Sequence, residues 1–388
     1  MICGASALGI GVLMALPAAL PASAAAAHPA PVSARHLKAL YDVGVHPGIT
    51  AAQARASALA GTTVPEYTAT VKVGAKSFKY TIVGKNPAIK VANASTTVNA
   101  EIVPLIMKFS NGDSWSPTTA DSCDPGASAL SRTQNSPIVK PQAHSFGGTS
   151  VGNVQVTNAF QRAEFWKDAQ ASGINPSYGV KLAFKTLSPV TINVPNADAA
   201  TASITCGNGL LGATDINWLD NHIQTVVIPS LQSQGVGTTT FPIFLVHNFV
   251  EYITTTSNCC VLGYHNSFNT SAGAQTYGLS IYDNSGAFSG SSDISALSHE
   301  VGEWQNDPNT ANPTPAWGHI GQVTGCQSNL EVGDPLSGTT FNDALGGFTY
   351  HPQELAFFSW FYHQKPSLGV NGWYSDQGTF KTFAKACT

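Results

Sequence analysis

The residues best suited to chemistry lie in one short segment, SSDISALSHEVGEWQNDP, at residues 291–308. Apolar residues recur there at the period of an α-helix, so the segment predicts a helix with one buried stripe. The stripe consists of Ile294, Leu297, Val301 and Trp304. We expect Asp293 to cap the N-terminus of this helix, because a short carboxylate side chain accepts the unpaired N–H groups there.

His299 and Glu303 are four residues apart, so a helix places both side chains on one face, about 5–6 Å apart at their Cβ atoms. An imidazole nitrogen and a carboxylate oxygen at this spacing can bind one metal ion. Glu300 is turned to one side, where it can act as general base on a metal-bound water without being a ligand. The pattern is the HExxH helix of metalloproteases with the second histidine replaced by glutamate.

A zinc ion on this helix would need a third protein ligand and an open position for water. The chain beyond the helix offers Asp307, His319, Glu331, Asp334 and His351. We favour Glu331 as the ligand and Asp334 as the support of a histidine, as in zincins whose third ligand is a glutamate. His351 is the alternative, because imidazole binds zinc well.

A metal-free explanation of the same helix stays open, because His299 and Glu303 could form a hydrogen-bonded pair on a half-buried surface. Metal binding is favoured because three ionisable residues cluster within one turn of an otherwise apolar helix. A strand predicted at 275–282 also precedes the helix, as in zincins. His265 could border the site, but a structural role is favoured for it and for His144, His222 and His247.

The segment SHEVGEWQNDP, followed by a tryptophan and by LEVGD, resembles a pattern of secreted bacterial proteins of unassigned activity. That similarity continues through CCVLGYH (259–265), WGHIGQ (317–322) and YHPQELAFFSWFY (350–362). Residues 298–334 also distantly resemble the plant phosphate-induced, EXORDIUM-like cell-wall proteins, which carry an HExxE helix and an E-I-G-D-like stretch. The resemblance implies a zincin-like fold for the second half of the chain, although Glu303 stands where standard zincins have histidine.

The N-terminus predicts export. An apolar run at 5–16 is followed by Pro17 and Pro21 and then by the small residues that signal peptidase recognises. The positively charged start of a signal peptide is missing, since no Lys or Arg precedes Arg35. We expect a signal peptide at 1–27, and no later segment predicts a membrane span.

The cysteines predict three disulfides in an exported chain, because six remain once the signal peptide and Cys3 are removed. They are Cys123, Cys206, Cys259, Cys260, Cys326 and Cys387. Adjacent cysteines rarely bond to each other, so we expect Cys259 and Cys260 to pair with Cys326 and Cys387. Cys123 would then pair with Cys206.

The distribution of apolar and polar residues along the chain after the signal peptide predicts an α+β fold. We expect a flexible leader at 28–62, a β-rich region and loop at 63–142, and a zincin-like α+β region at 143–388. Antiparallel strands are expected between Glu66 and Phe109, and further strands at 179–195, 241–252 and 275–282. Helices are expected at 36–41, 158–170, from Thr214, from Asp293 and at 351–363.

Charge and motifs narrow the function. Only 10% of the residues are charged and the net charge is −4, so we expect no nucleic-acid and no membrane partner. No GxSxG elbow, P-loop or GxGxxG motif occurs. The sequence favours a secreted zinc-dependent hydrolase, specifically a metallopeptidase acting on extracellular protein or peptide. The alternative is a non-catalytic cell-wall or carbohydrate-binding protein with a structural metal or none.

Overall fold

The computed structural model describes residues 32–33, 37–43, 64–175 and 177–388 of the chain. The predicted signal peptide at 1–27 and most of the predicted leader at 28–62 lie outside the described residues. The part that is described is mixed α and β and rich in strands.

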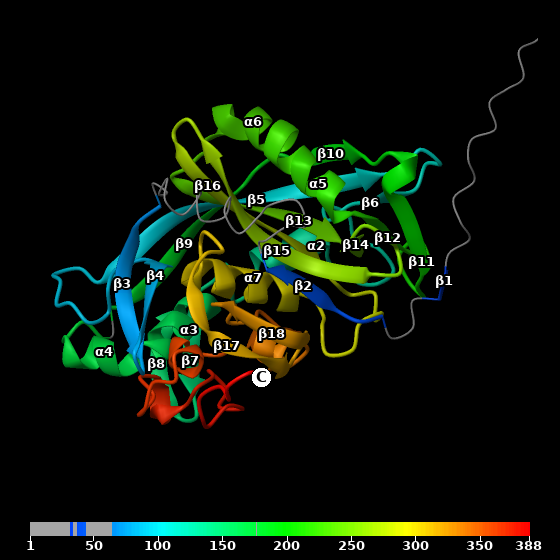
Figure 1. Cartoon of the computed structure of the whole chain (residues 1–388). Helices are drawn as coiled ribbons and strands as arrows, with labels where there is room; N and C mark the ends of the chain where they lie inside the picture. Colours follow the sequence, from blue (N-terminus) through cyan, green and yellow to red (C-terminus); the bar gives the residue numbers. More distant parts are fainter. Residues whose placement is uncertain (1–31, 34–36, 44–63, 176) are drawn as a thin grey trace, which may run out of the picture.

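One large sheet organises the described residues and curls like half a barrel (Figure 1). Its strands lie in the order β1 (Val32–Ser33), β11 (Ala199–Ser203), β12 (Leu210–Asp215), β14 (Phe249–Tyr252), β15 (Cys259–Thr270), β16 (Gly273–Tyr282), β13 (Thr240–His247), β5 (Ser95–Lys108) and β10 (Val190–Asn193). Strand β2 (Leu40–Val43) also pairs with β15, and β6 (Ser114–Trp115) and β9 (Gly179–Thr186) pair with β5. Strand β13 is parallel to both β5 and β16, whereas β15 is antiparallel to β16.

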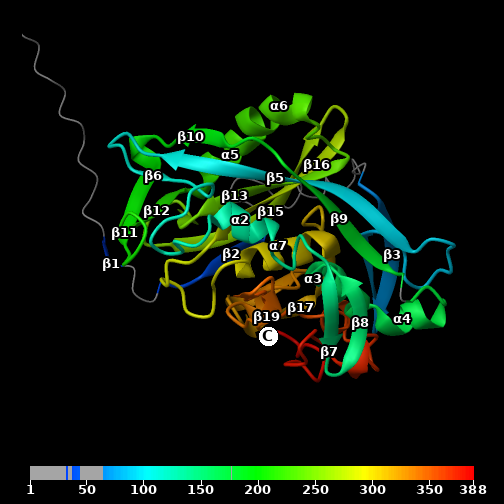
Figure 2. The ribbon, with the colours of Figure 1, turned by 180° about the vertical axis from the view of Figure 1, so that it is seen from behind.

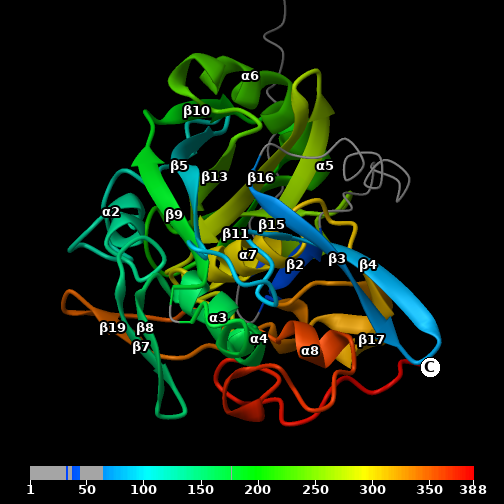
Figure 3. The same cartoon turned by 90° about the vertical axis from the view of Figure 1, so that its left-hand side faces the viewer.

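The middle of this sheet is covered on both faces. Every residue of β13 (TFPIFLVH) is buried, as expected for a parallel strand between two layers. Helices α5 (Ile216–His222) and α6 (Ile228–Leu231) lie on the outer side of the curl, and α7 (Ser295–Asn306) lies on the inner side (Figure 3). The strand predicted at 241–252 is divided into β13 and β14, because Asn248 takes a left-handed conformation between them (φ 48°).

Helix α7 is enclosed on all sides, and its 12 residues are all buried. It packs against β15 and β16 and also against α3 (Val156–Glu164) and β4 (Lys76–Val83). Figure 2 shows α7 between β15 and α3. The predicted apolar stripe is confirmed, with Ile294, Leu297, Val301 and Trp304 at most 2% exposed. Trp304 fixes the helix to the sheet, because its ring stacks on Phe241 at 3.8 Å and its Nε1 donates to Thr276 at 3.0 Å.

The predicted cap of this helix was wrong. Ile294 occupies the N-cap position, and Asp293 has a φ of 39°. The Asp293 carboxylate instead accepts the backbone N–H of His351 at 2.9 Å and lies 2.6 Å from Nδ1 of that histidine. The Asp293 side chain therefore binds the distant residue His351 instead of capping the N-terminus of α7.

The predicted antiparallel strands between Glu66 and Phe109 are confirmed only for the hairpin of β3 (Glu66–Val73) and β4. Strand β5 instead runs parallel to β9, β10 and β13. The predicted β-rich region thus contributes a strand to the same sheet as the second half of the chain.

Three predicted helices differ in the structure. The helix at 158–170 is two helices, α3 and α4 (Trp166–Ala171), joined at Phe165. The helix predicted from Thr214 is α5, and its N-cap is Asp215. Oδ1 of Asp215 accepts hydrogen bonds from the backbone N–H groups of Asn217 and Trp218. The helix at 351–363 is reduced to α8 (Phe358–Phe361), because backbone groups before it bond to distant segments.

The helix predicted at 36–41 was also wrong in its described part. Residues Leu40–Val43 form β2, which pairs in parallel with β15 and adds a strand beside the candidate site. This pairing is an interaction between residues more than 200 positions apart, and no local pattern indicates it.

The disulfides confirm the pair Cys123–Cys206 and correct the rest. Cys326 bonds Cys387, and Cys259 bonds Cys260. The peptide bond between these adjacent cysteines is cis, and their Cα atoms lie 3.0 Å apart. Three disulfides are consistent with an extracellular protein. Among the described residues, no helix has both the length and the apolar character that crossing a bilayer requires.

Candidate metal centre

Buried acidic and histidine side chains from three elements converge on the polar side of α7. The helix contributes His299, Glu300 and Glu303, and β15 contributes His265. The segment after β18 (Val323–Asn329) contributes Glu331 and Asp334. These six side chains are at most 2% exposed, so their charges are almost fully removed from water.

The first group is formed by His299, Glu303 and Asp334. Nε2 of His299 lies 3.0 Å from Oε1 of Glu303 and 3.6 Å from Oδ1 of Asp334. Neither nitrogen of His299 makes a hydrogen bond of good geometry with the described residues, although Glu303 lies within hydrogen-bond distance. Ligand atoms around a tetrahedral zinc with bonds of about 2.0–2.1 Å lie roughly 3.3 Å apart. The 3.6 Å separation from Asp334 fits two ligands of one cation, whereas the 3.0 Å separation from Glu303 fits either a shared cation or a hydrogen bond.

Other residues orient these ligand atoms. The backbone N–H of Gly333 donates to Oε1 of Glu303 at 3.0 Å. Gln322, between β17 (Pro313–Ile320) and β18, donates to Oδ1 of Asp334 at 2.5 Å and to the carbonyl of Tyr41 at 2.7 Å. Such contacts hold carboxylates in place and are typical of the surroundings of metal ligands.

Strand β2 covers this group. The ring of Tyr41 stacks on the ring of His299, with the centroids 3.9 Å apart and the planes 15° apart. The hydroxyl of Tyr41 lies 3.1 Å from that of Ser291, and its backbone N–H donates to Oε1 of Gln322. Strand β2 is therefore tied to the helix that contributes ligands and to Gln322, which in turn donates to the ligand Asp334.

The second group lies on the other side of Glu303 and contains His265 and Glu300. Nδ1 of His265 lies 3.3 Å from Oε2 of Glu300 and 3.7 Å from Oε2 of Glu303. Its Nε2 lies 3.2 Å from the backbone carbonyl oxygen of Asp307 and 4.0 Å from Oε2 of Glu331. Burial lowers the pKa of His265 to about 4 even though Glu303 opposes this shift, so the ring is neutral at neutral pH.

The carboxylates have unequal environments. Burial alone would raise the pKa of Glu303, but His299 and His265 outweigh it and hold that pKa below its usual value. Burial, followed by the charges of Glu303 and Asp307, raises the pKa of Glu331 well above its usual value. Burial also raises the pKa of Asp307 to about 7. The environment thus favours the ionised form of Glu303, between the two histidines, and the protonated form of Glu331.

The structure brings four predicted site residues together, namely His299, Glu300, Glu303 and Asp334, with Glu331 at their edge. Asp334 rather than Glu331 lies beside His299. Asp307 meets the site through its carbonyl oxygen, because its carboxylate accepts the N–H groups of Ala311 and Asn312. His265 is the one member for which the sequence favoured a structural role, although the CCVLGYH segment that ends in it could have indicated the site.

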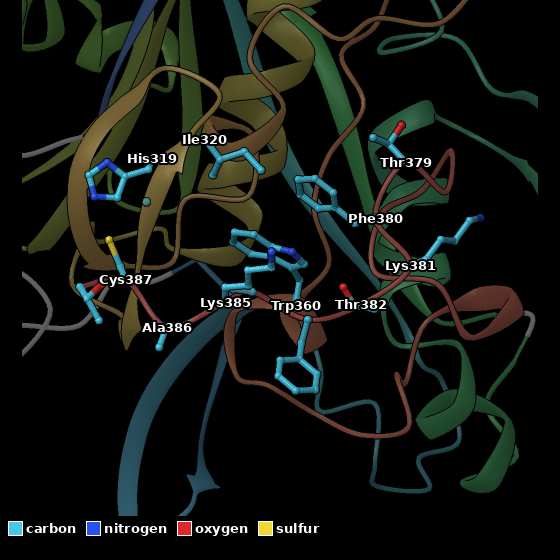
Figure 4. Close-up of a pocket in the computed structure, with 14 residues that line it drawn as sticks. His319, Ile320, Trp360, Thr379, Phe380, Lys381, Thr382, Lys385, Ala386 and Cys387 are labelled. Atoms are coloured by element: carbon cyan, nitrogen blue, oxygen red, sulfur yellow. The ribbon is translucent and has the colours of Figure 1, made fainter.

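Two predicted candidates lie elsewhere. His351 pairs with Asp293 beyond the N-terminus of α7. His319 is exposed and borders a separate cavity of about 620 Å³ between β17 and the C-terminal segment (Figure 4). That cavity contains Trp360 stacked on Phe380 at 5.1 Å, and it includes none of the six converging side chains.

Comparisons with known proteins leave the family open. No family model matches the chain, and no curated protein matches its sequence. One solved structure found is metalloproteinase-II from Bacteroides fragilis, at 10% sequence identity over 71% of this chain and 94% of that chain. The TM-score of 0.16 is too low to indicate a common fold. The function is therefore inferred from the residues of the site.

Proposed function

We propose that the protein is a metal-dependent hydrolase whose divalent cation is held by His299, Glu303 and Asp334. The observation that carries the proposal is the convergence of one imidazole nitrogen and two carboxylate oxygens, at 3.0 and 3.6 Å from the nitrogen, in a fully buried site. One imidazole and two carboxylates form a donor set that suits zinc. Zinc is accordingly the cation we propose.

The chain's own residues have distinct tasks in this proposal. His299 and Glu303 hold the cation from a rigid helix, while Gly333 and Gln322 orient the two carboxylates. A bound divalent cation would supply Lewis acidity toward the scissile group. Glu300 is turned away from His299 toward His265, so we assign it to the reaction rather than to the ion at His299.

We further propose a secreted peptidase with a zincin-like site. The HExxE helix and the strand that precedes it support this assignment. An extended peptide is the favoured substrate because β2 already lies as an extended segment along β15, beside the site. Pairing with a strand is a common way for proteins to bind peptides. The disulfides support an extracellular location.

The burial of the site favours a second candidate function. All six converging side chains are at most 2% exposed, and Tyr41 covers His299. A structural cation in a non-catalytic binding protein would require such enclosure. In that case the cavity between β17 and the C-terminal segment, lined by Phe380 and by polar side chains such as Thr379 and Lys381, is the place where we expect a ligand to bind.

Cleavage of casein and of a quenched fluorescent peptide library tests the proposal. Zinc-loaded wild-type protein should cleave, and the chelator-treated protein and the His299→Ala variant should not. His319→Ala is the matched control, because His319 is exposed and outside the site, and it should cleave like wild type. A wild-type protein that binds zinc but cleaves nothing would favour the structural cation, and one that binds no zinc would overturn the hydrolase and leave a binding protein without a metal.

A further inference from the structure

We propose that the site holds two divalent cations rather than one, with Glu303 bridging them and with His265 and Glu300 as ligands of the second ion. This inference rests on the proposed function, because it extends the same site. It gives Glu300 a role that differs from the general base expected from the sequence.

The orientation of His265 is the first argument. The carbonyl oxygen of Asp307 can only accept a hydrogen bond, so the ring nitrogen that faces it, Nε2 at 3.2 Å, carries the hydrogen. Nδ1 is then the nitrogen that can offer its lone pair to a metal ion. Histidines that bind metals usually donate their other N–H to a carbonyl or carboxylate in this way.

The atoms that surround Nδ1 of His265 are the second argument. Oε2 of Glu300 lies at 3.3 Å and Oε2 of Glu303 at 3.7 Å, so a nitrogen lone pair faces two carboxylate oxygens. Oε2 of Glu303 has no hydrogen-bond partner among the described residues. The separations are again close to the roughly 3.3 Å between ligands of one zinc ion. A cation between these atoms would satisfy all three.

The two oxygens of Glu303 are divided between the two groups. Oε1 lies 3.0 Å from His299, and Oε2 lies 3.7 Å from His265. A carboxylate that offers one oxygen to each side can bridge two ions, as happens in hydrolases whose metals lie about 3.5–4 Å apart. Glu303 thus belongs to both ligand groups because its two oxygens face different histidines.

The distribution of the carboxylates is the third argument. His299 lies with Glu303 and Asp334, and His265 lies with Glu300 and Glu303. Each histidine therefore has two carboxylates beside it, a donor set that suits a divalent cation.

Metal counting on intact protein tests the inference. After loading with zinc and removal of excess ion, elemental analysis should find two zinc ions per wild-type chain. His265→Ala and the more conservative Glu300→Gln should each bind one, while His319→Ala, the surface control, should still bind two. A count of one in wild type that neither substitution lowers would overturn the second ion and leave the proposed function standing. A count of zero would overturn both.

Electron paramagnetic resonance of the manganese-loaded protein gives a second readout that does not depend on a folded His265→Ala variant. Two ions that share Glu303 should be magnetically coupled in wild type. The Glu300→Gln variant should instead give the hyperfine spectrum of an isolated ion. An isolated-ion spectrum in wild type at saturating manganese would contradict the bridged pair.

Discussion

Gly333 lies directly against the ring of His299, so that a Cβ atom on Gly333 would be 2.4 Å from Nδ1 of the histidine. The backbone of Gly333 has an ordinary helical φ of −87°, so glycine is needed there for space and not for backbone freedom. Gly333→Ala should therefore displace His299 and weaken zinc binding by about 10–100-fold, the usual cost of disturbing the support of a metal ligand. Competition with a chromogenic chelator measures the affinity.

Gly325→Ala is the matched control for this substitution. A Cβ atom on Gly325 would meet nothing within 4 Å, so the zinc affinity should stay at the wild-type value. Equal affinities for Gly333→Ala and Gly325→Ala would show that His299 is not a ligand in its present position.

Asp334 and Glu331 should differ in their effect on the ion at His299. Asp334 lies 3.6 Å from His299, whereas Oε2 of Glu331 lies 4.0 Å from His265. Asp334→Ala should lower the affinity for the more tightly held zinc by at least the roughly 10–100-fold expected for a lost support. Glu331→Ala should lower it by less than that. Isothermal titration would reveal the opposite order if Glu331 is the third ligand, as the sequence favoured.

Tyr41 should control how easily the ion leaves. Its ring stacks on His299 at 3.9 Å, and the strand that carries it covers the ligand group. Tyr41→Ala should release zinc to a chelator several-fold faster than wild type, as followed by stopped-flow absorbance. Tyr41→Phe keeps the ring and loses only the hydroxyl contact with Ser291. It should resemble wild type, and equal rates for both variants would mean that the ring does not shield the ion.

Asp376 should make stability depend on pH. Burial, with help from the charge of Glu354, raises the pKa of Asp376 in the folded protein to about 8, compared with about 3.9 in the unfolded chain. Between about pH 3.9 and pH 8, Asp376 is therefore protonated in the folded protein and ionised in the unfolded chain. The free energy of unfolding should fall as pH rises through this window, by up to about 1.4 kcal/mol per pH unit.

Comparison with Asp376→Asn isolates this effect. Asparagine can still accept the N–H of Leu355, which Asp376 accepts at 3.0 Å, but it cannot ionise. In urea unfolding from pH 4.5 to pH 8, the variant should gain stability relative to wild type as pH rises. A difference between the two proteins that stays constant over this range would refute the raised pKa.

Sequence patterns within a short segment correctly predicted those features that depend on that segment alone. The period of Ile294, Leu297, Val301 and Trp304 predicted α7 because these residues pack on the sheet. The spacing of His299 and Glu303 predicted that they would lie together, since a helix fixes that distance. The even number of cysteines indicated three disulfides, although it did not determine their pairing.

Contacts between distant segments were not predictable from such patterns. His265 meets Glu300 because β15 packs on α7, and nothing near His265 in the sequence indicates a carboxylate. The same applies to Tyr41 and His299, which come together through the pairing of β2 with β15. Glu331 and Asp334 share one short segment, so only its path past the helix determines which of them lies beside His299.

The central claim is that these buried side chains hold a divalent cation, and anomalous scattering from crystals grown with zinc tests it most directly. Data collected at the zinc absorption edge should give a peak between Nε2 of His299, Oε1 of Glu303 and Oδ1 of Asp334. A second peak should lie between His265, Glu300 and Glu303. A single peak at His299 would support the proposed function without the second ion. The absence of any peak among these residues, in crystals that contain zinc elsewhere, would contradict the claim.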